Sequence, residues 1–243
     1  IYLCGLGPQR PIYKLERIVT NGPAPATLTE TGFFQDLATL EPSPQAIPYD
    51  INVPFWSDGA RKDRWAIVPH DGSFAQRIGY SAVDPWSFPE GTVWVKHFEL
   101  PVDETDPAVT IPVETRFLVE GYLGEVYGLT YQWRPDGSDA DLVPNGADVD
   151  YTITTAEGTR TQTWRYPSNA ECLQCHNPSA GPALGFSTKQ LNRDLTYPST
   201  GRTDNQLVTL SQIGLLDATV GPDDVDLLPR LAASDDETAP LQD

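Results

Sequence analysis

The alternation of apolar and polar residues along several segments of residues 60–166 restricts the fold of this chain more than any other sequence feature. Successive side chains of a β-strand point to opposite faces, so a period of two residues predicts strands. In residues 92–100 (TVWVKHFEL) the two faces carry Trp94, Lys96 and Phe98 on one side, and Val93, Val95 and His97 on the other. Further strand-like segments are Glu114–Glu120, Val126–Trp133, Tyr151–Thr155 and Thr161–Tyr166. We therefore predict that residues 60–166 are mostly antiparallel β-structure.

The number of turn-forming residues also favours a fold with many short strands. The 243 residues include 23 Pro and 19 Gly, which interrupt regular elements and favour turns. Residues 156–158 (AEG) separate the last two strand-like segments and predict a β-hairpin there.

The net charge and the hydropathy pattern exclude two classes of partner. Sixteen Lys and Arg against 34 Asp and Glu give a formal charge of −18. Nucleic acids and anionic membranes need a basic surface, so neither is an expected partner. Apolar residues make up 39% of the chain, and no run approaches the 18 uncharged apolar residues that predict a membrane-spanning helix.

Helical signals are short. Ser168 or Asn169 can cap a helix with Glu171 in its first turn, and that helix would end at residues 172–176 (CLQCH). Two further segments predict helical structure, a capped turn at Thr29–Leu37 (TETGFFQDL) and a helix within Thr203–Gly214. The second places Leu207, Leu210 and Ile213 at helical spacing.

Residues 172–176 have the spacing of a haem c attachment motif. In such a motif Cys172 and Cys175 bind the two vinyl groups of one porphyrin, and His176 becomes the proximal iron ligand. The motif therefore predicts one covalent haem c in this chain. It also predicts a periplasmic or extracellular protein, because the attachment takes place there.

Two other uses of this motif stay open. Zinc needs four ligands, and without a second cysteine pair the missing ones would come from His70, His97, His176 or carboxylates. A thioredoxin-like dithiol expects a βαβ context, which the surrounding sequence lacks.

Several blocks of sequence occur in an order that resembles a known family. They are Leu28–Phe34 (LTETGFF), Ile47–Gly59 (IPYDINVPFWSDG), Phe88–Phe98 (FPEGTVWVKHF), Glu114–Val119 (ETRFLV), Trp164–His176, Leu184–Asn192 (LGFSTKQLN) and Asn205–Leu207. Together they resemble a family of bacterial secreted c-type cytochrome proteins, often with two haems. In some members the domain is fused behind a β-propeller similar to PQQ-dependent sugar dehydrogenases. The resemblance covers about residues 28–242.

The resemblance also implies that the chain is an excerpt of a longer polypeptide. Family members carry a second CxxCH beyond the equivalent of residues 232–241, and the chain contains no Met. Residues 1–20 contain two strand-like pieces, which are either a hairpin or the closing strands of an upstream β-domain. We expect an antiparallel β-sandwich-like domain at 21–166 and a small helical cytochrome c-like haem segment at 167–243, itself truncated.

The function implied is electron transfer. The haem would accept electrons from a linked or docked dehydrogenase, PQQ-dependent in the fused members. Two alternatives are a haem enzyme whose open sixth position reacts with a small oxidant such as peroxide, and a zinc-stapled binding module without redox function.

The sixth iron ligand has few candidates, because the chain has no Met and only three His. His70 lies in a predicted turn (PHDG), where water satisfies its ring. His97 lies beside Val93 and Val95, where a half-buried imidazole needs a partner for each nitrogen. His97 is therefore the candidate distal ligand, with a hydrogen-bonded structural histidine as the alternative.

Overall fold

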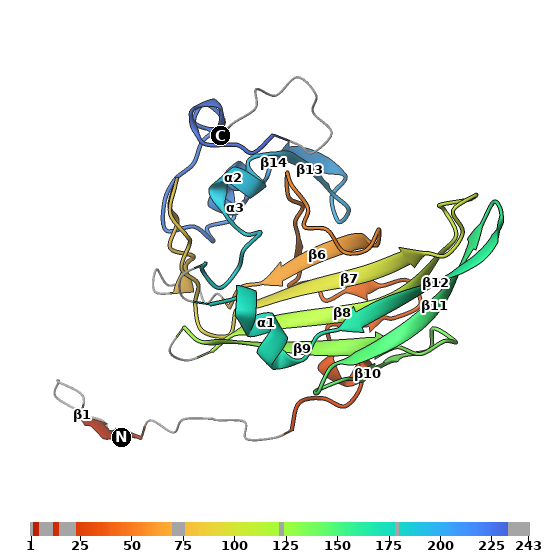
Figure 1. Ribbon diagram of the computed structural model, residues 1–243. Coiled ribbons are helices and arrows are strands. Elements are labelled where there is room, and N and C mark those ends of the chain that lie inside the picture. The colour runs from red at the N-terminus through yellow and green to blue at the C-terminus, as the bar shows by residue number, and fades with distance from the viewer. Residues whose placement is uncertain are drawn as a thin grey trace.

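A six-stranded antiparallel sheet forms the centre of the fold, and its strands follow one another in space as they do in sequence (Figure 1). The strands are β5 Ile47–Pro48, β6 Arg61–Ile67, β7 Val93–Pro101, β8 Thr110–Glu120, β9 Val126–Trp133 and β10 Ala140–Leu142. Every neighbouring pair is antiparallel. The prediction of a mainly antiparallel β-fold is confirmed.

The structure is a computed structural model that describes residues 23–69, 76–121, 124–177 and 180–232, together with the backbone of 2–4 and 12–14. The remaining elements are β1 Tyr2–Cys4, β2 Ile12–Lys14, η1 Thr29–Thr31, β3 Phe34–Asp36, β4 Glu41–Pro42, β11 Ala147–Thr155, β12 Gly158–Tyr166, α1 Asn169–Cys175, α2 Thr188–Leu191, β13 Asp194–Tyr197, β14 Arg202–Asn205, α3 Gln206–Gln212 and η3 Val225–Leu227. Strands β1 and β2 pair as an antiparallel hairpin. No helix among the described residues has the length and apolar character needed to cross a membrane.

One face of the sheet, here called the His97 face, is covered by the segment that contains β3 and β4. Trp65, Val95 and Phe117 are cross-strand neighbours on this face, and Phe33 and Phe34 pack edge-on against Trp65. The buried cluster comprises Leu28, Phe33, Phe34, Trp65, Val95, Phe117, Tyr131, Trp133 and Ala140. Burial of these aromatic side chains is the main stabilising contribution on this side of the sheet.

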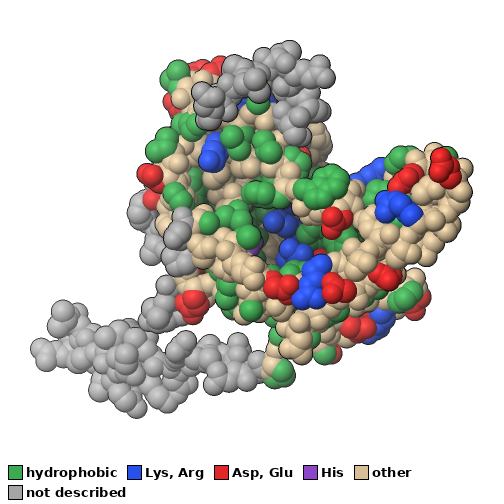
Figure 2. All heavy atoms as spheres, in the orientation of Figure 1, with side chains coloured by type: hydrophobic (Ala, Val, Ile, Leu, Met, Phe, Trp, Pro, Cys, Tyr) green, Lys and Arg blue, Asp and Glu red, His purple; other side chains and the backbone are tan. Residues whose placement is uncertain are grey.

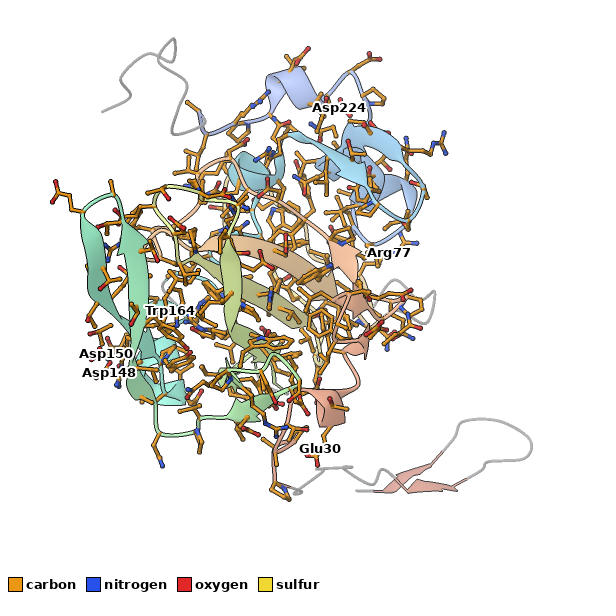
Figure 3. The ribbon with its side chains drawn as sticks, turned by 90° about the vertical axis from the view of Figure 1, so that its right-hand side faces the viewer. Glu30, Arg77, Asp148, Asp150, Trp164 and Asp224 are labelled. Atoms are coloured by element: carbon orange, nitrogen blue, oxygen red, sulfur yellow. The ribbon has the colours of Figure 1, made fainter. Side chains whose placement is uncertain are left out.

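The opposite face, here called the Lys96 face, has cross-strand neighbours Arg64, Lys96 and Arg116 at its middle. An apolar cluster lies on either side of these cations. One cluster packs under the β11–β12 hairpin and comprises Phe98, Leu100, Val113, Ile153, Trp164 and Tyr166. The other joins the sheet to the C-terminal helices and includes Ala66, Trp94, Leu118, Phe186, Leu191, Leu207, Leu210 and Leu216. In Figure 3 Trp164 lies on the sheet side of the hairpin, and Asp148 and Asp150 lie at its outer edge.

The segment beyond the predicted boundary at 166/167 contains the β13–β14 hairpin as well as helices, so it is not wholly helical as expected, and the buried core crosses the boundary. Ala66, Trp94 and Leu118 of the sheet pack with Phe186 and Leu207 from beyond the boundary. The helical segment and the sheet therefore bury apolar surface against each other.

Two of the short helical predictions need correction. Thr29–Thr31 forms one 3-10 turn, which ends at Gly32 in the left-handed region (φ 65°). The chain then extends into β3, because Phe33 and Phe34 are buried against the sheet.

The helix expected within Thr203–Gly214 begins later than its first cap signal. Thr203 pairs with Thr196 in the β13–β14 hairpin, and Asn205 is the residue that caps α3. The side chain of Asn205 accepts a hydrogen bond from the Leu207 N–H at 2.9 Å. Leu207 and Leu210 are buried as the spacing predicts, whereas Ile213 is half exposed.

Candidate functional site

Helix α1 carries both cysteines, and a capping box fixes where it begins. The Ser168 hydroxyl accepts a hydrogen bond from the Glu171 N–H at 3.4 Å, and the Glu171 carboxylate accepts one from the Ser168 N–H at 2.8 Å. Arg165 donates two further hydrogen bonds to this carboxylate, which lower the pKa of Glu171 to about 2. The predicted start of the helix is correct, because reciprocal capping satisfies its first N–H groups.

Helix α1 packs directly on strand β9 at Gly128, a residue that has no side chain. The Gly128 N–H donates to the Asn169 side-chain oxygen at 2.8 Å. A Cβ atom on Gly128 would lie 2.7 Å from the sulfur of Cys172. Cys172 is buried and Cys175 is exposed, and burial raises the pKa of the Cys172 thiol. The glycine therefore permits the close approach that places Cys172 against the sheet.

His176 follows the last turn of α1 and has a defined ring orientation. Its backbone N–H donates to the Cys172 carbonyl at 3.0 Å, and its Nδ1 lies 2.7 Å from the carbonyl oxygen of Pro182. A carbonyl only accepts hydrogen bonds, so Nδ1 carries the proton and Nε2 keeps its lone pair. Burial lowers the pKa of His176 and favours this neutral ring. A neutral imidazole bonded in this way through one nitrogen is the usual form of a metal ligand.

Cys172 and His176 line a small cavity against the Lys96 face. Lys96 and Arg116 line it from the sheet, and the remaining lining residues are Tyr49, Trp94, Leu118, Ala183, Leu184, Gly185 and Phe186. Figure 2 shows the molecular surface hollowed in this region, with Lys and Arg side chains at the bottom. The cavity thus combines one thiol, an imidazole and cationic side chains, whereas Cys175 is exposed and does not line it.

The two cations in this cavity have different environments. The Arg116 guanidinium binds the buried Glu114 carboxylate at 2.6 Å and lies 5.1 Å from the centre of the Phe98 ring. Lys96 forms no hydrogen bond or ion pair with any residue that the structure describes. Burial, and then the positive charges of Arg116, Arg64 and Lys62, lower the pKa of Lys96 to about 7.

The structure does not bring His97 together with the cysteine motif. His97 follows Lys96 on β7 and so points to the opposite face of the sheet. Its ring is fully buried, with Nδ1 2.9 Å from the Thr115 hydroxyl and the Trp133 ring centre 5.4 Å away. This placement corrects the expectation of a distal ligand and matches the alternative, a structural histidine. His70 lies outside the described residues.

Burial of His97 predicts an acid-sensitive fold. Burial lowers the pKa of His97 to about 4, so between pH 6.5 and 4 the unfolded chain takes up a proton that the folded chain excludes. Stability is therefore lost as the pH falls through this range, by about 2 kcal/mol at pH 5. His97→Gln should remove this loss, as measured by urea unfolding at pH 7 and pH 5. Equal losses in both proteins would contradict the assignment.

The chemistry of the donor set fits haem c. Two cysteines one helical turn apart precede an imidazole whose Nε2 is available, as covalent attachment and proximal ligation require. The free volume of the cavity is about 30 Å³, which is less than a porphyrin ring occupies. Ala183, Leu184 and Phe186 line both this cavity and a neighbouring one of about 560 Å³. In this conformation the cavity therefore does not hold a porphyrin ring.

No group of three or more His, Cys, Asp or Glu side chains among the described residues is arranged to hold a metal ion. The zinc alternative therefore gains no ligand set from this part of the chain. Comparisons of the chain with protein-family models, with curated proteins and with solved structures find no match.

Sequence reasoning missed three contributors to the site, Pro182, Lys96 and Arg116. The carbonyl of Pro182 has no sequence signature. Lys96 lies between Trp94 and Phe98 on its face of β7, and a cation at such a position is the signal that could have identified it. Arg116 shares its face of β8 with Glu114 and gives no such signal.

Proposed function

We propose that this protein is a c-type cytochrome module that transfers electrons, with one haem c bound through Cys172, Cys175 and His176. The observation that carries the proposal is the hydrogen bond from His176 Nδ1 to the Pro182 carbonyl. It orients the ring and leaves Nε2 available directly after the second cysteine of a haem attachment motif. A haem bound here supplies one-electron chemistry.

The residues around the motif have defined roles in this proposal. The Pro182 carbonyl holds the proton on His176 Nδ1, and Trp94, Leu118 and Phe186 keep water from the ligand. The positive charges of Lys96 and Arg116 favour the reduced, less positive state of a nearby redox centre. In this proposal the Pro182 carbonyl orients the ligand, and the cations of the sheet tune the potential of the centre.

The proposal includes location and partners. Haem c attachment occurs in the periplasm or outside the cell, so we place the protein there. The electron donor would be a linked or docked dehydrogenase, as the family resemblance implies. The charge of −18 suits a donor or acceptor with a basic docking surface.

The test is expression in a bacterial periplasm with the haem c attachment machinery, followed by intact mass measurement. We expect the mass to exceed that of the polypeptide by one haem, and a reduced pyridine haemochrome spectrum typical of two thioether bonds. Cys172→Ala/Cys175→Ala should carry no covalent haem, whereas Cys4→Ala should carry as much as the wild type. A wild-type mass equal to the bare chain would contradict the proposal. Stoichiometric zinc in that chain would favour the zinc-stapled module instead.

A further inference from the structure

The middle of the Lys96 face has an excess of positive charge, although the chain as a whole carries a charge of −18. Four basic residues lie there at alternate or cross-strand positions: Lys62, Arg64, Lys96 and Arg116. Arg64 and Arg116 each have a carboxylate partner, at 3.1 Å and 2.6 Å. Among the described residues no ion pair joins a carboxylate to Lys62 or Lys96. Cations removed from water need compensating negative charge, so this face favours an anion from outside the chain.

Two of these cations meet in one cavity with donors to spare. Lys96 and Arg116 are direct cross-strand neighbours on β7 and β8, and both line the small cavity on this face. The Lys96 ammonium forms no hydrogen bond with any residue that the structure describes. Arg116 donates through its Nε to Glu114, and no described residue accepts a hydrogen bond from its two terminal nitrogen atoms. The cavity therefore offers two charged donor groups to a ligand.

The size and shape of the cavity restrict the class of anion. Its free volume of about 30 Å³ holds only one or two groups the size of a water molecule. A carboxylate is small and planar, and its two oxygens can accept from the ammonium and the guanidinium at once. Neighbouring side chains on one face of an antiparallel pair are about 5 Å apart at Cβ, so one carboxylate can reach both. Trp94, Leu118 and Phe186 form apolar walls, which strengthen such a charged contact by excluding water.

We propose that this cavity binds the carboxylate group of a small organic acid between Lys96 and Arg116. Binding is non-covalent, and formate and acetate are the smallest acids of this class. Figure 2 shows Lys and Arg side chains at the bottom of a hollow that opens to solvent, which leaves room for the rest of a larger acid. The proposal goes beyond electron transfer. Neither the cysteines nor an iron atom takes part in it, so it is tested separately from haem attachment.

Two substitutions of Lys96 and one control test the site. Lys96→Met removes the charge and keeps a side chain of similar length. Lys96→Gln keeps a hydrogen-bond donor without the charge, so its affinity for a carboxylate should lie between those of the wild type and Lys96→Met. Lys62→Met is the matched control. It removes a cation of the same face that does not line the cavity and whose Nζ donates to the Phe55 carbonyl.

The probe is sodium formate at pH 6, with sodium methanesulfonate, whose sulfonate group is larger than the cavity, keeping the ionic strength constant. Burial lowers the pKa of Lys96 to about 7, so its ammonium is charged at this pH. Saturation-transfer NMR of the formate proton measures binding, and thermal unfolding measures stabilisation. We expect formate at ten times its Kd to raise the Tm of the wild type by about 3 °C. Lys96→Met should bind formate about tenfold more weakly or worse, and Lys62→Met should bind it as the wild type does.

Thermal unfolding without formate shows that each variant is folded. Equal formate binding by the wild type and Lys96→Met would overturn the proposal, and so would a wild type that gives no saturation transfer. Chloride that displaces formate as effectively as acetate does would overturn the assignment to carboxylates. Intact mass records whether each preparation carries haem. A chain without haem that binds formate would support this proposal while contradicting haem attachment.

Discussion

Replacing Glu114 with alanine is expected to lower the free energy of unfolding by about 3 kcal/mol. The Glu114 carboxylate is fully buried on β8 and accepts hydrogen bonds from Arg116 Nε at 2.6 Å and from Trp164 Nε1 at 3.0 Å. It therefore joins the sheet to the β11–β12 hairpin. Its removal leaves the Trp164 N–H buried without a partner and leaves Arg116 without a counter-charge. Chemical unfolding of the two proteins measures the difference.

The matched control is Glu104→Ala. Glu104 also accepts a hydrogen bond from an arginine Nε, that of Arg160 at 2.7 Å, but both side chains are about half exposed to solvent. Water replaces the lost partner there, so we expect a loss below about 1 kcal/mol. Glu114→Gln, which keeps an acceptor for Trp164, should fall between the two. Similar losses for Glu104→Ala and Glu114→Ala would show that burial of the Glu114 pair is not what stabilises the hairpin.

Replacing Gly128 with valine is expected to have the second large effect, a loss of about 3 kcal/mol and reduced haem attachment. A Cβ atom at Gly128 would lie 2.7 Å from the Cys172 sulfur and 3.0 Å from its Cβ, closer than van der Waals contact allows. Helix α1 would have to move away from β9, which displaces Cys172 and breaks the bond between Gly128 and Asn169. Thermal unfolding and the fraction of chains with haem, from intact mass, measure the two effects.

The control for this substitution is Gly221→Ala. The nearest atom to a Cβ there is the Asp224 carboxylate oxygen at 3.4 Å, at the end of a side chain that can turn away. We expect a change within about 0.5 kcal/mol and normal haem attachment. Gly128→Val with wild-type stability would mean that α1 does not need its close approach to the sheet.

The long strands of the sheet can be predicted from the sequence because each repeats its two-residue period several times. Strand β7 shows this most clearly, since the faces of Lys96 and His97 follow directly from the alternation. Edge strands of two or three residues, such as β5 and β10, are too short to show a period. At Thr29–Leu37 the capping signal competes with the burial of two phenylalanines, and burial prevails.

Some parts of the candidate site can likewise be predicted from the local sequence, and others depend on contacts between residues far apart in the chain. The positions of Cys172, Cys175 and His176 at the end of a capped helix are encoded within ten residues, so sequence reasoning can place them. Which face of β7 meets that helix depends on Gly128, which is about 30 positions from Lys96 along the chain. No local sequence pattern shows which face of β7 meets the helix. For this reason sequence reasoning could select His97 as an iron ligand, although it lies on the face away from the cysteine motif.

The apolar cluster shared by the sheet and the C-terminal helices has a consequence for how the chain can be divided. Trp94 and Leu118 of the sheet complete the packing around Phe186 and Leu207. Residues 167–232 by themselves would leave the apolar surface around Phe186 and Leu207 uncovered, so we do not expect them to fold without the sheet. A substitution at Trp94 or Leu118 therefore also changes the packing of the segment that follows the cysteine motif.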